Sequence, residues 1–538
     1  MDKRKNTKNN SKERFLVAGI ALVMQVFWVI YQVKWINDIY PITEGLSHFL
    51  ALMLVIRIYG KHTNAAMKIP WMVLLLIFPI TGLILYSIFA SRISKYAVKR
   101  RFKYIMDKLY QYLYKDDDLL ADLKESEPDI YGQVHYISKI GRFPAYNQGQ
   151  VTYYPDAKLG VEAQKEAMRQ AKKFIFMEYH AIEDSVSFQE IEEILVEKAK
   201  EGLDVRVVYD DVGSLVFIDK SFRKRLEVEG IKCRVFNPIG PVLNVFMNNR
   251  DHRKITVIDG KIGFTGGYNL ADEYFNLVNP YGHWKDTGIK IEGRPVDSLT
   301  LMFLEMWHAS KSTKKINEDI KALINQWEEE GTETETEETC QGLQSDKNII
   351  IQPFAENPLK EELLAENAYM NMAKNAKDYL YITTPYLLID DNMSEELSSA
   401  AKRGVDVRIV TPGTSTEIAT EIAVSKRIVY KMTRSYYGGL ARNGVRIYEY
   451  MPGFIHAKQH ISDDKTAIIG TINMDYRSLY HHFENGVFMH NVDCIKDMRA
   501  DFEHIFDQSY EVTDKYASGR STSLRIVQCL WRFVAPLM

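Results

Sequence analysis

Two short motifs of the chain carry residue types that can act on a phosphate ester. Each has a histidine, a lysine two positions later and an aspartate five positions after the lysine: His252, Lys254 and Asp259 in the first copy, His456, Lys458 and Asp463 in the second. An asparagine follows each histidine by seventeen positions, as Asn269 and Asn473. One His-x-Lys triplet arises by chance on many amphipathic strands. Two copies with matching aspartate and asparagine spacing indicate a functional site.

The chemistry of these side chains suggests phosphoryl-type transfer without a metal. A neutral imidazole is a nucleophile near neutral pH, and an imidazolium is a general acid. One histidine could attack phosphorus while the other protonates the departing alkoxide, which forms a phosphohistidine intermediate. The lysines and asparagines would bind the substrate phosphate and neutralise its oxygens. We therefore expect no metal and no cofactor in this reaction.

The spacing also indicates how the motifs are positioned. Residues two apart on a strand point to the same face, so each histidine should project with its lysine. Residues 259–260 and 463–464 are typical of hairpin turns, and each returning strand would bring an asparagine beside its histidine. Two such hairpins meeting across a pseudo-dyad would surround one phosphate.

The motifs lie inside a longer duplication. An apolar strand at 174–177, a helix ending in glycine and a second strand at 203–208 recur at 379–382 and 405–410. A period of about 200 residues that occurs twice indicates a duplicated domain. We predict an α/β fold of two duplicated lobes that share one active site, at 105–327 and 348–515, joined by an acidic linker at 328–347.

The front of the chain is apolar. After a basic tip at 1–14, residues 15–92 form a predicted membrane region in which 15–36 and 69–90 are each long enough to span a bilayer. The run 46–59 between them would be re-entrant or interfacial. Basic flanks on both sides predict two crossings, with the catalytic body cytoplasmic. Three crossings, with the body outside, and a signal peptide at the first segment are the alternatives. The amphipathic tail at 520–538 would dock on the body or lie on the bilayer.

The motifs and their surroundings resemble the phospholipase D superfamily. The longer context is similar to bacterial cardiolipin synthases over nearly the whole chain, through the segments at 249–254, 263–269, 284–287, 452–458 and 473–478. Two departures are mild: Thr471 replaces a glycine, and the interval between Lys458 and Asp463 is polar.

This resemblance implies a membrane-bound enzyme that transfers a phosphatidyl group between two phosphatidylglycerol molecules and releases glycerol. It also implies that His252 is the nucleophile and His456 the general acid, although the near-equivalent halves leave the reverse open. Asp286 and Glu484 stand where the superfamily places carboxylates. They would either cross over to orient the opposite histidine or be plain surface residues.

Composition limits the rival functions. The net charge of −3 argues against a nucleic-acid partner and hence against a membrane-tethered nuclease. A phospholipase D hydrolase or phosphodiesterase, in which water resolves the intermediate, stays open, and a catalytically inactive lipid-binding scaffold is a further alternative.

The four cysteines are scattered and predict free thiols. We interpret His180, His460, His481 and His482 as ordinary polar positions because none lies in a repeated motif. The oligomeric state is not predicted.

Overall fold

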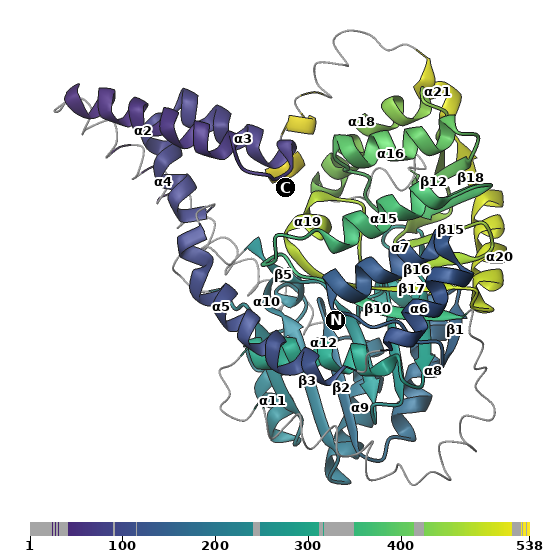
Figure 1. Cartoon of the computed structure of the whole chain (residues 1–538). Coiled ribbons are helices and arrows are strands. Elements are labelled where there is room, and N and C mark those ends of the chain that lie inside the picture. Colours follow the sequence, from purple (N-terminus) through teal and green to yellow (C-terminus); the bar gives the residue numbers. More distant parts are fainter. Residues whose placement is uncertain are drawn as a thin grey trace.

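The computed structural model describes residues 41–89, 92–113, 116–239, 248–310, 349–413 and 424–518, with a few positions near both termini and at 316. Two α/β lobes form the body, and a helical arm projects from it (Figure 1). The predicted tip at 1–14, linker at 328–347 and most of the tail at 520–538 lie outside the described residues, as does most of the segment at 15–36.

Each lobe is built on a mixed sheet, and the two sheets share a strand order, to which the second sheet adds β18 at one edge. The first runs β1 (Gln150–Tyr154), β9 (Gly288–Glu292), β7 (Ile262–Gly266), β6 (Lys254–Ile258), β2 (Phe174–Tyr179), β3 (Asp204–Asp210) and β4 (Lys232–Phe236). The second runs β10 (Ile350–Glu356), β17 (His482–His490), β16 (Thr466–Gly470), β15 (Gln459–Ser462), β11 (Tyr379–Thr383), β12 (Asp406–Pro412), β13 (Arg446–Tyr450) and β18 (Ser509–Glu511). The predicted duplication in an α/β fold is confirmed.

Helices connect the parallel strands and cover the sheets. The predicted crossovers are α9 (Val186–Lys200) between β2 and β3 and α16 (Asp391–Lys402) between β11 and β12, with each strand pair parallel. The other main helices of the lobes are α6 (Asp117–Ser126), α7 (Pro128–Tyr136), α8 (Ala157–Arg169), α11 (Phe222–Val228), α12 (Val296–Ser310), α15 (Leu364–Asn375), α18 (Val424–Ala441) and α20 (Cys494–Asp507). Helix α12 is buried on nearly every face because it packs against β2, β4 and β6 of the first sheet and β10 of the second.

The arm consists of α2 (Pro41–Tyr59), α3 (Ala65–Ile77) and α4 (Pro79–Phe89), and α5 (Arg92–Leu109) leads from it to the body. The structure corrects the prediction of one continuous span at 69–90, because α3 ends before Phe78 and α4 begins at Pro79. A residue that precedes proline is disfavoured in helical conformation, and Phe78 has φ −128° and ψ 73°. Gly82 then lets the two helices pack closely, since a Cβ there would lie 2.8 Å from the Leu75 Cα. Among the described residues, no helix combines the length and apolar character needed to cross a bilayer.

Candidate active site

Two short parallel ladders join the lobes and determine which residues meet at the site. Strand β5 (Arg250–Asp251) pairs with the start of β17, and β8 (His283–Lys285) pairs with β14 (Gly453–Ile455). The backbone N–H of His252 then donates to the Phe483 carbonyl at 2.8 Å, and that of His456 donates to the Lys285 carbonyl at 2.7 Å. His252 therefore lies beside Glu484, the residue after Phe483, and His456 lies beside Asp286, the residue after Lys285.

Glu484 and Asp286 each contact the motif histidine of the opposite lobe. Nδ1 of His252 lies 2.9 Å from Oε2 of Glu484, and Nδ1 of His456 lies 2.7 Å from Oδ2 of Asp286. Each carboxylate thus contacts the histidine of the opposite lobe, and both are buried. A carboxylate on Nδ1 fixes the tautomer that leaves Nε2 as the reactive nitrogen.

Both carboxylates are themselves held in place. Thr471 donates its hydroxyl to Oε2 of Glu484 at 2.5 Å, and the Thr287 N–H donates to Oδ1 of Asp286 at 2.9 Å. Burial raises the pKa of Asp286, but the nearby His456 and Lys458 outweigh it, so the pKa lies below its ordinary value. Asp286 is therefore ionised at neutral pH.

The two motif lysines are buried beside their histidines. The Lys254 ammonium donates to the His252 carbonyl at 2.7 Å, and Nζ of Lys458 lies 2.7 Å from Nδ1 of His456. Desolvation by burial lowers the pKa of Lys254 to about 8 and that of Lys458 to about 7. The lysines are positive but can lose their charge close to neutral pH.

Both histidines are neutral in the resting site. Burial lowers the pKa of His456 to about 3, and Lys458 adds to the effect. Burial also lowers the pKa of His252 well below its ordinary value, with contributions from Lys254, His180, Lys458 and His456. The residues of the two lobes thus act on each other electrostatically, as expected where both motifs face one site.

The two asparagines differ in their hydrogen bonding. Asn269 accepts from the Ala181 N–H at 3.1 Å and donates to the Tyr274 hydroxyl at 2.8 Å. The buried Oδ1 of Asn473 has no hydrogen-bond partner among the described residues. Asn269 therefore helps to position Ala181 and Tyr274, and its amide is already hydrogen-bonded before any substrate binds.

Asp259 and Asp463, which the sequence predicts to be catalytic, have their hydrogen-bond partners at the opposite end of the motif strands from the histidines. Asp259 accepts from the backbone N–H groups of 172, 173 and 174 at the far end of β6, and Asp463 accepts from those of 377, 378 and 379. Both have positive φ, of 53° and 56°, in the turns of the β6–β7 and β15–β16 hairpins. The predicted hairpins are confirmed, and these aspartates anchor them.

Sequence reasoning missed two histidines beside His252. The His180 ring lies 4.9 Å from the His252 ring, and the His482 ring lies 5.4 Å from it, between centroids. His180 follows β2, whose last residue pairs with Lys254, and His482 precedes Glu484 by two positions on β17. The shared strand face of His482 and Glu484 was the available signal. His460 instead stacks on Tyr369, with ring centroids 3.9 Å apart.

Aromatic rings surround the other histidine. The centroids of Trp284, Tyr274 and Phe454 lie 5.2, 5.4 and 5.9 Å from that of His456. All three rings are buried. This wall brings together η4 (Asp272–Phe275), β8 and β14, and it was not predicted.

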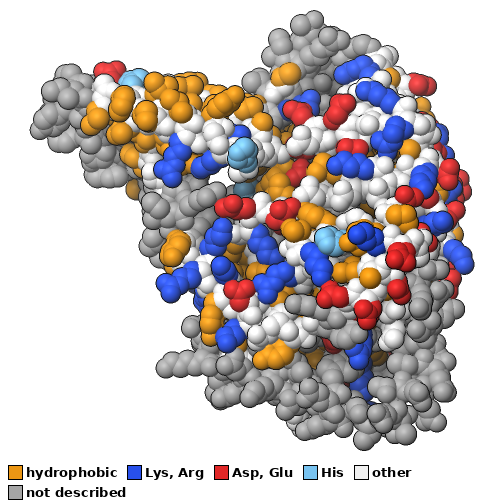
Figure 2. Space-filling model, viewed as in Figure 1, with side chains coloured by type: hydrophobic (Ala, Val, Ile, Leu, Met, Phe, Trp, Pro, Cys, Tyr) orange, Lys and Arg blue, Asp and Glu red, His pale blue; other side chains and the backbone are white. Residues whose placement is uncertain are grey.

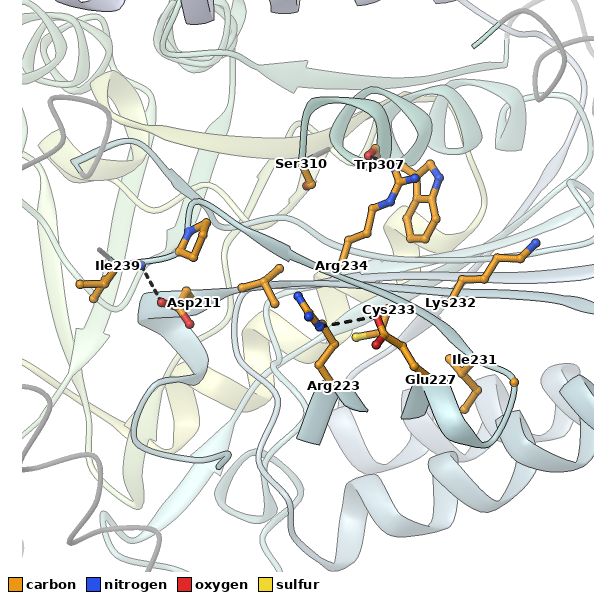
Figure 3. A pocket seen from close by; sticks show the side chains of 13 residues that line it. Asp211, Arg223, Glu227, Ile231, Lys232, Cys233, Arg234, Ile239, Trp307 and Ser310 are labelled. Carbon is orange, nitrogen blue, oxygen red and sulfur yellow. Dashed lines mark hydrogen bonds and ion pairs between the residues drawn. The ribbon is translucent and has the colours of Figure 1, made fainter. Parts of the chain in front are cut away.

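A surface pocket of about 630 Å³ lies elsewhere, along the edge strand β4 (Figure 3). Its basic residues are Arg223, Lys232 and Arg234, and the Arg234 guanidinium lies 3.8 Å over the Trp307 ring. The pocket contains none of the motif residues, and we assign it no role in the chemistry.

Comparisons with known proteins agree with this arrangement. Residues 165–307 and 369–506 match a family described as "Cardiolipin synthase, PLD-like domain", and residues 49–90 match "Phospholipase_D-nuclease N-terminal". The chain is 31% identical to cardiolipin synthase 2 of Bacillus cereus over 89% of this chain and 88% of the relative. It is 29% identical to the cardiolipin synthase of Halalkalibacterium halodurans over 98% of this chain and all of the relative (100%). The fold resembles a phosphatidylserine synthase of Haemophilus influenzae, with a TM-score of 0.57 and 12% identity over 75% of this chain and 99% of the other.

Proposed function

The chain belongs to the cardiolipin synthase family of phospholipase D-like proteins, and on this premise we propose that it joins two phosphatidylglycerol molecules into cardiolipin and releases glycerol. The observation that carries the proposal is the pair of crossed contacts, His252 with Glu484 and His456 with Asp286. One phosphodiester is exchanged for another, so the reaction needs no ATP.

In the first half-reaction, Nε2 of His252 attacks the phosphorus of one phosphatidylglycerol. The bond from phosphorus to the glycerol oxygen breaks, and His456 gives its proton to that oxygen. Burial lowers the pKa of resting His456 to about 3, so the imidazole is neutral before substrate binds. We propose that His456 takes up a proton from solvent when the substrate binds, because the anionic phosphodiester offsets the positive Lys458 and Lys254 that disfavour the imidazolium.

In the second half-reaction, His456 takes a proton from the hydroxyl of the second phosphatidylglycerol. That oxygen attacks the phosphohistidine, and the bond from phosphorus to His252 breaks. The wall of Trp284, Tyr274 and Phe454 around His456 supports a lipid alcohol as acceptor, because apolar rings disfavour water at the group that must activate the nucleophile. We propose that the ammonium groups of Lys254 and Lys458, which lie beside the two histidines, bind the phosphate oxygens, and that Asn473 donates to them through its amide N–H groups.

We further propose that the arm formed by α2, α3 and α4 enters the bilayer that holds the substrate. Hydrophobic side chains gather on its surface, whereas charges of both signs cover the lobes (Figure 2). Its exposed large apolar residues are Leu46, Phe49, Leu50, Leu52, Met53, Ile56, Tyr59, Ile69, Leu76, Ile77 and Phe78. A patch of this kind on a chain with phospholipid substrates favours a membrane interface. A cytoplasmic body with residues 15–36 as a further span stays a prediction.

The test is incubation of the purified full-length protein in phosphatidylglycerol vesicles that carry a label in the glycerol headgroup and another in the acyl chains. We expect free glycerol and cardiolipin in equal amounts, and no product from His252→Ala. Phosphatidic acid as the main product would identify a hydrolase. Full turnover by His252→Ala would contradict the assigned nucleophile.

A further inference from the structure

A cluster of two imidazoles and a carboxylate lies on the His252 side of the site. His252, His482 and Glu484 each offer a ligand atom, and these atoms lie within 4.8 Å of one another. All three side chains are buried. We propose that this cluster binds a divalent transition metal such as Zn²⁺, and that the bound metal inhibits the enzyme. The binding half of the proposal stands on the cluster alone, and only the inhibition half rests on the proposed function.

The unpaired atoms of the cluster support a ligand. Neither ring nitrogen of His482 has a hydrogen-bond partner among the described residues, and the same holds for Oε1 of Glu484. Nδ1 of His482 lies 3.6 Å from that oxygen, which is longer than a hydrogen bond. A buried polar atom without a partner destabilises the fold, and a cation bound between His482 and Glu484 would provide a partner for each side chain.

The donor set fits zinc and its neighbours in the first transition row. Two imidazoles and one carboxylate form a common zinc ligand set that leaves a fourth position open. Zinc–ligand distances of about 2.0–2.1 Å place tetrahedral ligands about 3.4 Å apart. The ligand atoms lie within 4.8 Å of one another, so the side chains would rotate to bring them to this spacing when the metal binds.

Metal binding would block the nucleophile directly. A neutral imidazole has a single nitrogen lone pair available in its ring plane, and its other nitrogen carries a proton. Whichever nitrogen of His252 coordinates the metal, no lone pair is left to attack phosphorus. In this proposal the metal inhibits the reaction and takes no part in it.

Nearby charges limit the affinity. Lys254 and Lys458 both act electrostatically on His252 and would repel a cation, whereas Glu484 is the carboxylate within the cluster that attracts it. His180 holds the Asp251 carbonyl at 2.6 Å through Nδ1 and so borders the cluster without adding that nitrogen as a ligand. We expect reversible binding that is weaker than at a closed structural zinc site, as suits regulation.

The experiment uses the full-length protein, freed of metal by chelation, and Co²⁺ as a coloured probe. We compare wild type with His482→Asn, which removes one imidazole, and with His490→Asn, a buried histidine at the other end of the same strand β17. Co²⁺ absorption is titrated first, and Zn²⁺ is then added to displace the cobalt, since zinc binds more tightly. Inhibition of cardiolipin formation by Zn²⁺ is measured separately, relative to each variant's own activity in chelator.

We expect His482→Asn to weaken both Co²⁺ binding and Zn²⁺ inhibition by at least about tenfold, and His490→Asn to leave both unchanged. Absence of the cobalt spectrum in wild type, or equal binding in His482→Asn, would overturn the site. Binding that depends on His482 but leaves activity intact would overturn the inhibition. If the protein makes no cardiolipin, the cobalt titration still decides the binding question, so the two failures are distinguishable.

Discussion

On the His252 side of the site the nearest rings are the imidazoles of His180 and His482, whereas on the His456 side they are Trp284, Tyr274 and Phe454. The backbone around the two histidines is nevertheless the same. Each follows a short strand whose partner strand contains its carboxylate (Glu484 in β17) or directly precedes it (Asp286 after β8), and each is followed two positions later by a buried lysine.

The contrast shows which features the duplication keeps. Parallel pairing between the lobes fixes the crossed carboxylates, because the register of a ladder determines which side chains are level. The side chains beyond that register are free to diverge. One half of the site can therefore become polar, with groups that bind and hold protons, while the other becomes apolar and favours an alcohol over water.

The largest effects should come from removing each histidine. We expect His252→Ala and His456→Ala to lower cardiolipin formation by about 10⁴-fold or more. An aryl phosphodiester, whose leaving group needs no proton, should separate them. His456→Ala should still form a phosphohistidine that mass spectrometry detects, and His252→Ala should not. If only His252→Ala formed the covalent intermediate, the two roles would be reversed.

The crossed carboxylates should give the next largest effects. We expect Glu484→Gln and Asp286→Asn to lower kcat with phosphatidylglycerol by about 10²–10⁴-fold, because each loses the charge that holds its histidine in the reactive tautomer. The aryl substrate should rescue Asp286→Asn, which acts through the general acid, far more than Glu484→Gln. The measurement is the ratio of kcat values on the two substrates. Equal rescue of both variants would show that the halves do not have separate roles.

A smaller effect should appear as a pH dependence on the His456 side. Burial lowers the pKa of Lys458 to about 7, so its charge is present below that pH and is lost as the pH rises through it. We expect kcat/KM to fall by about tenfold per pH unit above this pKa if the ammonium binds the phosphate. Lys458→Arg keeps the charge and should remove this limb of the profile. A flat profile between about pH 6 and 9 in the wild type would show that the charge of Lys458 is not needed.

The sequence predicted those parts of the fold that follow from local pattern. Helix-stop glycines before β-branched runs placed β3 and β12 in their lobes, and the Asp259–Gly260 pair placed the β6–β7 turn. The sequence left two alternatives for Asp286 and Glu484, either a contact with the histidine of the opposite lobe or a plain surface position. Only the pairing between lobes brings these residues to the opposite histidines.

The unpredicted features depend on contacts between distant elements. His180 reaches His252 because β2 lies beside β6, and Phe454 reaches Trp284 because β14 pairs with β8. Composition predicted one long span at 69–90, but backbone sterics at Phe78 and Pro79 produced two shorter helices. For Asp259 the spacing within the motif predicts a catalytic role, whereas its hydrogen bonds to the backbone of residues 172–174 indicate a structural one.

The smallest effect on the catalysed reaction should come from substitution of Asp259. Asp259 and Asp463 each satisfy three backbone N–H groups at the start of a central strand, far along β6 or β15 from the histidine. Asp259→Ala should lower the free energy of unfolding by about 1–3 kcal/mol, measured by thermal or denaturant unfolding, because three backbone amides, two of them partly buried, lose their acceptor. Asp259→Asn should cost less, since an amide keeps one acceptor oxygen and asparagine tolerates the positive φ of 53°. Activity per folded molecule should change by less than about twofold in both, because surface and turn substitutions that leave the site intact act on stability alone. A loss of kcat comparable to that of Glu484→Gln, with stability unchanged, would return Asp259 to the catalytic set and end the distinction between the two ends of the hairpin.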